Sequence, residues 1–265
     1  MNKFLWSAFA LLRAFYCCGQ DAALIAHSAA TCNYSLNSND VWSASCNPAG
    51  LTEVKKLSCG LFYNSNFLIK DISSQYLIAA FPLNKKISSA ISLFRFGNEF
   101  YSKNQISIGG GMRLNDNIRL GAQLHFQYIY QSEQSPLYYA FPELGISYRI
   151  NNKLNASSAI RNFTSNLYNE HKINEAQLLR IGLSYVFDEK IKIHAQIIFQ
   201  NKNYPFVGVG IDYFPKEKIC IGFNISSTNQ PFNIGVGYKL KPVEIKIAFA
   251  YHQFLGISPA SAIVL

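Results

Sequence analysis

The chain has 265 residues, of which 49% are hydrophobic and 15% are charged, and its formal net charge is +9. A soluble globular domain carries about 25% charged residues, so this composition favours a protein with much apolar surface in lipid. The sequence contains no run of about 18 uninterrupted apolar residues, so we expect no membrane-spanning helix. The basic residues lie in short turns without a nucleic-acid motif, which argues against nucleic acid as a partner.

Residues 1–19 are predicted to be a secretory signal peptide. Lys3 supplies the positive start, residues 4–12 form the apolar core, and residues 17–19, Cys-Cys-Gly, provide a cleavage site of small residues. Arg13 interrupts the apolar region. A lipoprotein signal and an amphipathic N-terminal helix are the alternatives, but residues 14–16 lack the small side chains expected before a lipidated cysteine. Export of the chain follows from the preferred interpretation.

Residues 20–55 show no sustained alternation and are predicted to form an N-terminal plug or periplasmic segment. Pro48 fixes its own φ and Gly50 tolerates positive φ, which is the chemistry of a turn. We expect the segment to fold back into the periplasmic mouth of the barrel predicted below, against its inner wall. The predicted plug residues are Trp42, Asn47, Pro48, Ala49 and Gly50.

Four cysteines remain if the signal peptide is removed, and none forms a Cys-x-x-Cys pair, so zinc binding is not indicated. Cys32 and Cys46 form a disulfide in one interpretation, which an oxidising periplasm would permit. In the other they are small buried thiols. Spacing alone does not establish disulfide geometry, so both interpretations stay open.

Residues 118–130 are the clearest predicted strand. Apolar residues from Ile118 to Tyr130 occupy every second position, and the intervening residues are polar or small except Ile129. Period two indicates a β-strand with one apolar face. The segment is longer than the roughly 9–11 residues that cross a bilayer at a tilt, and its apolar face ends in tyrosines, which suit the membrane interface. We therefore predict a transmembrane strand.

The same alternation recurs along residues 56–265, which are predicted to form a transmembrane antiparallel β-barrel of about 14 strands. Short connections at 84–86, 115–117, 151–153, 188–190, 215–217 and 241–242 alternate with longer loops such as 97–104, 131–140 and 162–175. Short periplasmic turns and longer outer loops are typical of Gram-negative outer-membrane barrels, so both termini are expected in the periplasm. A soluble sandwich or lipocalin-like barrel, the alternative, would need polar outer faces.

The predicted strand segments are 57–68, 72–83, 87–96, 105–114, 118–130, 141–150, 154–163, 178–187, 191–200, 204–214, 218–226, 232–240 and 243–251, with a final segment at 254–265 that Pro259 interrupts. On this register Leu120, Leu124, Ile193 and Ile197 face the outer-membrane lipids.

The polar faces of these strands are predicted to line the lumen. The candidate lumen-lining or ligand-binding residues are Arg119, Gln123, His125, Gln127, Arg180, His194, Gln196 and His252. A self-satisfied polar interior without a transport role is the alternative. The histidines come from distant strands without metal-ligand spacing, so no metal or other cofactor is expected. No Gly-x-Ser-x-Gly motif is present, and we expect no catalytic residue and no enzymatic activity.

The run Asn47-Pro48-Ala49-Gly50-Leu51 ahead of about fourteen strands resembles the FadL-like superfamily of outer-membrane proteins. The closing run at 251–256, Tyr-His-Gln-Phe-Leu-Gly, looks like the end of PorV-like barrels, which are associated with type IX secretion. Two departures stand out: the chain is short for a FadL-type transporter, and its last four residues, Ala-Ile-Val-Leu, lack a terminal aromatic.

The resemblance implies three possible functions. The first is a PorV-like accessory or docking subunit of an outer-membrane assembly or secretion machine, with outer-membrane or periplasmic protein partners, which the small loops favour. The alternative is a FadL-like channel or binding protein for small hydrophobic compounds. A mainly structural barrel is the third.

Overall fold

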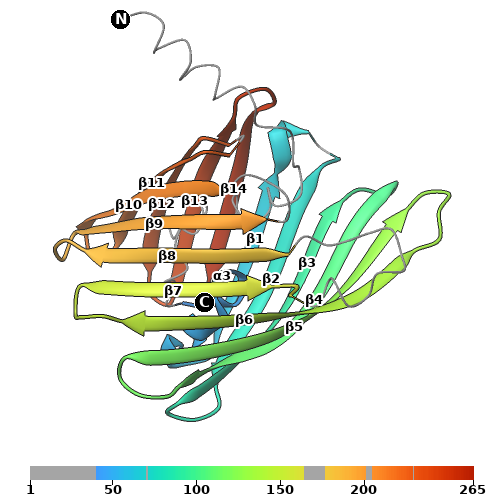
Figure 1. The fold of residues 1–265 in the computed structure, drawn as a ribbon. Helices are drawn as coiled ribbons and strands as arrows, with labels where there is room; N and C mark the ends of the chain where they lie inside the picture. Colours follow the sequence, from blue (N-terminus) through green and yellow to red (C-terminus); the bar gives the residue numbers. More distant parts are fainter. Residues whose placement is uncertain (1–39, 70, 164–176, 201–204, 229) are drawn as a thin grey trace, which may run out of the picture.

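The computed structural model describes residues 40–69, 71–163, 177–200, 205–228 and 230–265 (Figure 1). Within these ranges the chain forms a closed antiparallel barrel of fourteen strands, β1 to β14, in which each strand pairs with its sequence neighbours and β14 pairs with β1. The predicted fold class is confirmed. Among the described residues, no helix has the length and apolar character needed to cross a membrane.

Two short helical elements, α3 (Ser43–Cys46) and the 3₁₀ helix η1 (Pro48–Glu53), precede the barrel. The strands are β1 (Ser58–Ser65), β2 (Ser73–Pro82), β3 (Ile87–Gly97), β4 (Tyr101–Arg113), β5 (Ile118–Gln131), β6 (Leu137–Arg149), β7 (Leu154–Arg161), β8 (Leu178–Val186), β9 (Ile191–Gln200), β10 (Phe206–Lys216), β11 (Ile219–Ser226), β12 (Phe232–Leu240), β13 (Val243–His252) and β14 (Gly256–Val264). The three neighbours β4, β5 and β6 are the longest, with 13, 14 and 13 residues.

Strand alternation places apolar side chains on the outside of the barrel. In β5, Leu124 and Phe126 are 40% and 49% exposed, whereas Gln123 and His125 are 4% and 1% exposed. Large apolar side chains are exposed in the same way on every strand except β7, and a belt of this extent requires lipid as its solvent. The protein is therefore an outer-membrane β-barrel of the Gram-negative type. Leu120, Leu124, Ile193 and Ile197 all lie on the outer face.

One end of the barrel carries the short turns, and we call it the short-turn end. At four of these turns the side chain of the first residue accepts two backbone N–H groups, which closes an Asx turn. These residues are Asn84, Asn115, Asn151 and Asp188, with distances of 2.7–2.9 Å. The opposite end is the long-loop end.

Four predicted boundaries are wrong, and one of them is the loop predicted at 131–140, because β6 begins at Leu137. Residues 66–68 form a 3₁₀ turn, η2 (Asn66–Leu68), and do not extend β1, because Phe67 and Leu68 adopt positive φ. The connection predicted at 97–104 is shorter in the structure, because β3 ends at Gly97 and β4 begins at Tyr101. Gly97 has φ +104°, and Asn98 accepts the N–H groups of Phe100 and Tyr101, both at 3.0 Å. The turn predicted at 215–217 moves, because β10 continues through Lys216 with an irregular register.

The final segment is a complete strand despite Pro259. Residues of β14 pair with β13 along their whole length, and Ala260 is the first residue paired with β1. Pro259 therefore precedes the β1 ladder and interrupts no pairing with β1. Leu265 adds two backbone hydrogen bonds to Cys59, at 2.9 and 3.1 Å, which extend the pairing of β14 with β1.

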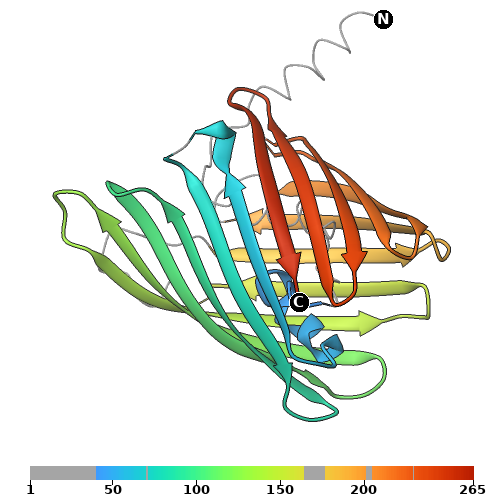
Figure 2. The ribbon, with the colours of Figure 1, turned by 180° about the vertical axis from the view of Figure 1, so that it is seen from behind.

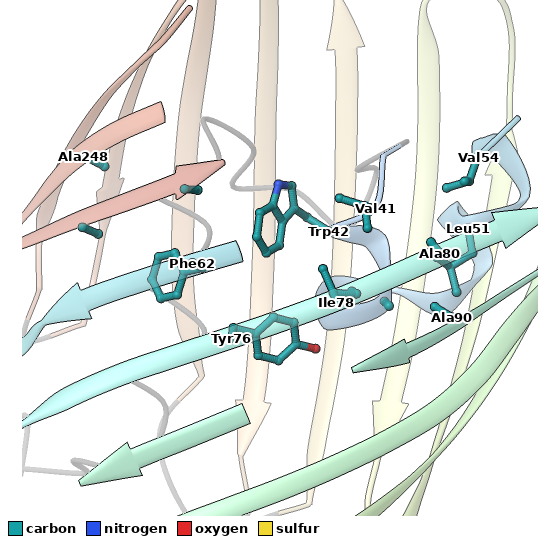
Figure 3. Close-up of a cluster of buried hydrophobic side chains, with 13 residues drawn as sticks. Val41, Trp42, Leu51, Val54, Phe62, Tyr76, Ile78, Ala80, Ala90 and Ala248 are labelled. Atoms are coloured by element: carbon teal, nitrogen blue, oxygen red, sulfur yellow. The ribbon is translucent and has the colours of Figure 1, made fainter. Parts of the chain in front are cut away.

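The segment that enters the lumen lies inside the short-turn end, near the C-terminus (Figure 2). We call the described part of it, from Val41 to Val54, the inner segment. It supplies Val41, Trp42 and Leu51 to the main apolar cluster of the protein, which is completed by side chains of β1, β2, β3, β13 and β14. Figure 3 shows Trp42 between Phe62 and Ile78.

The predicted signal peptide at 1–19, Cys32 and most of the loop predicted at 162–175 lie outside the described residues. Cys46 is a buried thiol in α3. Its predicted disulfide with Cys32 stays a prediction.

Candidate functional site

The inner segment contacts the barrel wall at a row of three glycines. Gly111 on β4 faces Gly121 on β5, which faces Gly145 on β6. A Cβ at Gly111 would lie 2.7 Å from the Pro48 carbonyl oxygen, and one at Gly121 would overlap the backbone of Pro48 and Ala49. These glycines, which we call the glycine row, let the wall approach the inner segment backbone to backbone.

Asn47 fixes the inner segment on this row. Its Oδ1 accepts the Ala49 N–H at 3.1 Å, which caps η1, and its Nδ2 donates to the Ile146 carbonyl of β6 at 3.2 Å. Pro48 occupies the first turn of η1, where a missing N–H is tolerated. A Cβ at Gly145 would collide with the Asn47 side chain. The Asn-Pro-Ala sequence and the glycine row therefore fit one another.

Further contacts attach both ends of the inner segment. Glu53 pairs with Arg113 at 3.0 Å and with Arg119 at 2.9 Å, and the Val54 carbonyl accepts from Ser88 at 3.2 Å. On the neighbouring strands β1 and β2, Trp42 packs on Gly60, where a Cβ would lie 2.9 Å from the indole ring, and its ring lies 6.4 Å from that of Tyr76. The segment thus contacts the continuous part of the wall that runs from β1 to β6.

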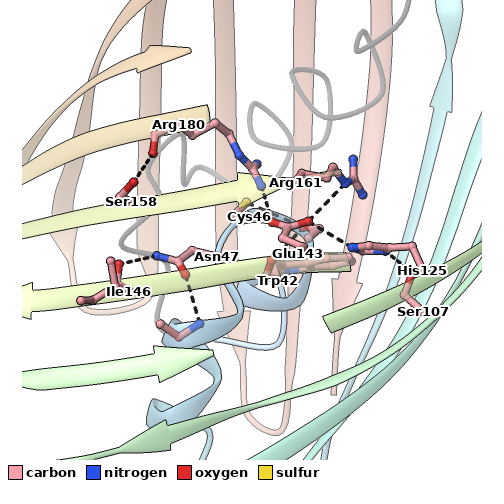
Figure 4. Close-up of polar contacts among 12 residues, drawn as sticks. Trp42, Cys46, Asn47, Ser107, His125, Glu143, Ile146, Ser158, Arg161 and Arg180 are labelled. Atoms are coloured by element: carbon pink, nitrogen blue, oxygen red, sulfur yellow. Dashed lines mark hydrogen bonds and ion pairs between the residues drawn. The ribbon is translucent and has the colours of Figure 1, made fainter. Parts of the chain in front are cut away.

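A buried charged cluster lies on β5 to β8 inside the barrel. Glu143, 1% exposed, contacts Arg180 at 2.5 Å, His125 at 3.1 Å and Arg161 at 3.2 Å. Figure 4 shows these side chains converging on the carboxylate. Both Glu143 oxygens have cationic or histidine partners, and the other ring nitrogen of His125 contacts Ser107 at 2.8 Å. We call Glu143, His125, Arg161 and Arg180 the charged cluster.

All eight predicted lumen residues lie on the inner face, but in separate groups. His125 and Arg180 meet in the charged cluster, and Arg119 pairs with the inner segment. Gln127 donates to the Tyr139 hydroxyl. Gln123 is buried beside the cluster, since it faces Glu143 across the strand pair.

The remaining three lie elsewhere. His194 contacts Asp212 at 2.7 Å, and Gln196, 9% exposed, lies two residues further along β9. His252 closes the β13–β14 loop, because its Nδ1 accepts the N–H groups of Phe254 and Leu255 at 3.2 and 3.1 Å. No group of three or more metal-ligating side chains occurs in the described part of the chain.

Sequence reasoning missed Glu53, Arg161 and the glycine row as parts of the site. Arg161 was detectable in principle, because the turn at 151–153 brings it opposite Glu143. Glu53 carries no such signal, since no strand ladder places it.

The outer wall behind the glycine row is hollowed into an apolar groove of about 720 Å³. Met112, Leu120, Leu144 and Ile146 line it on the lipid side. The groove lies within the apolar belt. The glycine row also borders the groove, so only the strand backbone separates the groove from the inner segment at this place.

Taken together, these features define a fourteen-strand outer-membrane barrel with a short N-terminal segment folded into its lumen. No family model and no curated protein matches the sequence. Solved structures do match. The chain is similar to the Pseudomonas putida toluene transporter TodX, with 11% identity, a TM-score of 0.59, and coverage of 84% of this chain and 91% of that chain.

Two further structures match over similar lengths. One is the CymD monoaromatic hydrocarbon channel, with 11% identity, a TM-score of 0.58, and coverage of 86% of this chain and 91% of that chain. The other is a Pseudomonas aeruginosa FadL homologue, with 10% identity, a TM-score of 0.58, and coverage of 87% and 93%. Identity this low shows a shared FadL-type fold alone. The predicted closeness to PorV-like barrels gains no support from these structures.

Proposed function

We propose that this protein is a plugged outer-membrane channel or binding barrel for small hydrophobic compounds. The observation that carries the proposal is an apolar sector on the inner wall. Inward positions of β13, β14, β1 and β2 hold Ala248, Ala250, Ala260, Phe62 and Ile78, each 6% exposed or less. A water-filled pore has a polar interior, so an apolar wall favours an apolar ligand.

The inner segment is the plug in this proposal. It occupies the short-turn end, which we assign to the periplasm, and it packs on the apolar sector through Trp42. A hydrophobic compound would pass along the alanine-lined wall only when Trp42 and the turn at Asn47 move away. Occlusion of the mouth makes the protein a gated binder and not an open pore.

The structural neighbours support the same class of function. Their names describe a toluene transporter and a monoaromatic hydrocarbon channel, and they are channels and transporters, not enzymes. The accessory role of a PorV-like subunit rests on the short closing motif at 251–256, which in the structure is the β13–β14 loop with His252. A transport role has the broader support, and we adopt it.

Binding of radiolabelled toluene to the full protein in lipid nanodiscs tests the proposal, with empty nanodiscs subtracted. We expect saturable binding, competed by unlabelled alkylbenzenes, and ionic conductance far below that of a porin. Ala250→Asp should abolish saturable binding by placing a charge in the apolar sector. Asn155→Asp, on the polar inner face of β7, is the matched control and should retain it. Absence of saturable binding to the folded wild type would refute the proposal.

A further inference from the structure

A second polar group lies on the inner wall away from the charged cluster. Asn233 on β12 faces Asn224 on β11, which faces Gly210 on β10, which in turn faces His194 on β9. Asp212 lies two residues from Gly210 on the same face and contacts the Nε2 of His194 at 2.7 Å. We call His194, Asp212, Asn224 and Asn233 the β9–β12 patch.

The hydrogen-bonding capacity of this patch is mostly unused. The Nδ1 of His194, the Oδ1 of Asp212 and both amide atoms of Asn224 and Asn233 are buried and have no hydrogen-bond partner among the residues that the structure describes. The four side chains are 3%, 3%, 1% and 1% exposed. Folded proteins pair nearly all buried polar groups, so a concentration of unpaired atoms on one wall points to a ligand that pairs them.

The protonation pattern limits what that ligand can be. A carboxylate only accepts hydrogen bonds, so the Nε2 of His194 donates to Asp212, and in the neutral imidazole the Nδ1 is an acceptor. The patch thus offers two acceptors, on His194 and Asp212, together with two amides that both donate and accept. A group that donates and accepts at once, such as a hydroxyl, matches this set.

An anionic group matches it poorly. A ligand carboxylate would meet the unpaired Oδ1 of Asp212 at close range. Lys192 is the basic residue opposite Asp212. Its Nζ lies over the Phe214 ring, 5.0 Å from the ring centroid, and this contact engages its charge. The charged cluster, with two arginines, lies on other strands and is already occupied by Glu143.

The wall beside the patch is smooth and apolar. Gly222 and Gly235, which continue the row of Asp212, contribute no side chain, and the same row reaches Ala248. Asn233 faces Ala250 directly. A ligand whose polar group sits on the patch would therefore lay its apolar body along the alanines.

We propose that the β9–β12 patch binds the uncharged hydroxyl group of a small amphiphile, such as an alkylphenol, whose apolar body lies on the Ala248–Ala250 wall. The proposal rests on the proposed function, because it assigns the polar end of a ligand held by the same lumen. It makes a hydroxylated aromatic compound a better ligand than the parent hydrocarbon.

The test compares three probes of one shape, which are toluene, p-cresol and 4-methylbenzoate, in nanodiscs that contain the full protein. We expect p-cresol to bind at least tenfold more tightly than toluene, and 4-methylbenzoate to bind more weakly than p-cresol. The Asn224→Leu and Asn233→Leu double variant should lower the affinity for p-cresol to that for toluene and leave toluene binding unchanged. Asn155→Leu, the same chemical change on the inner face of β7, should keep the preference.

Heat-dependent gel mobility checks that each variant is a folded barrel, and the single variants replace the double variant if it does not fold. Equal affinity of the wild type for p-cresol and toluene would overturn the inference, as would a preference for 4-methylbenzoate or a preference for p-cresol that survives the substitutions. These outcomes leave toluene binding intact. Loss of toluene binding itself would instead count against the proposed function, so the two failures are distinguishable.

Discussion

The glycine row makes a direct prediction about how the plug is held. Gly121→Ala adds a methyl group whose carbon would overlap the backbone of Pro48 and Ala49. A backbone neighbour cannot rotate away, so the inner segment must shift. Overpacking of this kind costs about 1–3 kcal/mol. If the cost falls on docking of the plug, the undocked population rises about 5-fold to 150-fold, at roughly 1.4 kcal/mol per factor of ten.

Cys46 reports this change, because it lies in α3 and is 6% exposed. Burial raises the pKa of its thiol, and the thiolate is the reactive form, so a docked plug should react slowly with a neutral maleimide. We expect Gly121→Ala to accelerate modification of Cys46 by the factor above. Mass spectrometry of reduced, labelled protein assigns the modified cysteine.

Gly237→Ala is the matched control. Gly237 also lies on the inner face, but its added Cβ would meet the flexible Lys246 side chain at 3.3 Å, which can give way. Its Cys46 labelling rate should stay within about twofold of the wild type, since the added methyl meets no backbone atom of the inner segment and a change of about 0.5 kcal/mol or less is expected. A folded Gly121→Ala barrel that labels Cys46 at the wild-type rate would refute the idea that the glycine row holds the plug.

Three other predictions follow from the same geometry. Deletion of residues 21–52 should raise single-channel conductance in planar bilayers while the barrel stays folded, and no change would contradict the plug. Leu124→Arg should lower the free energy of unfolding in lipid vesicles by about 2–4 kcal/mol near the midplane, whereas Gln123→Arg should be mild; equal tolerance would contradict the register. Glu143→Gln should lower the free energy of unfolding by about 3 kcal/mol in the same lipid vesicles, because two buried arginines lose their carboxylate; a neutral result would show that the cluster is not a buried ion pair.

The barrel was predictable because alternation and turn residues act locally. In a strand with period two, the sequence shows which residues lie on each face. An Asx turn at Asn115 or Asn151 then fixes the register of the two strands that it joins. The pairing of Gly111 with Gly121 follows from the turn at 115–117, as the pairing of Glu143 with Arg161 follows from the turn at 151–153. These contacts were accessible to sequence reasoning, although it did not use them.

Other parts of the site depend on information that the local pattern lacks. Gly145 joins the glycine row only through the register of β5 with β6, and the connection between them was predicted at 131–140, whereas β6 begins at Leu137. The short turn at Asn98 was hidden for a related reason. Its effect depends on a positive φ at Gly97, which a strand pattern does not encode. The contacts of the plug are harder still to predict from the sequence, because no strand pairing connects the plug to the wall.

The Glu143 carboxylate and the β9–β12 patch differ in how fully their buried polar atoms are paired. A barrel that serves only as a scaffold gains from pairing every buried polar atom, and the Glu143 carboxylate follows this rule. The β9–β12 patch departs from it, because Asn224 and Asn233 have all four amide atoms buried without partners in the described ranges. Leaving such groups unpaired destabilises the fold. Their position beside Ala250 therefore argues for a lumen that holds an amphipathic ligand, and against a barrel that is merely filled by its own side chains.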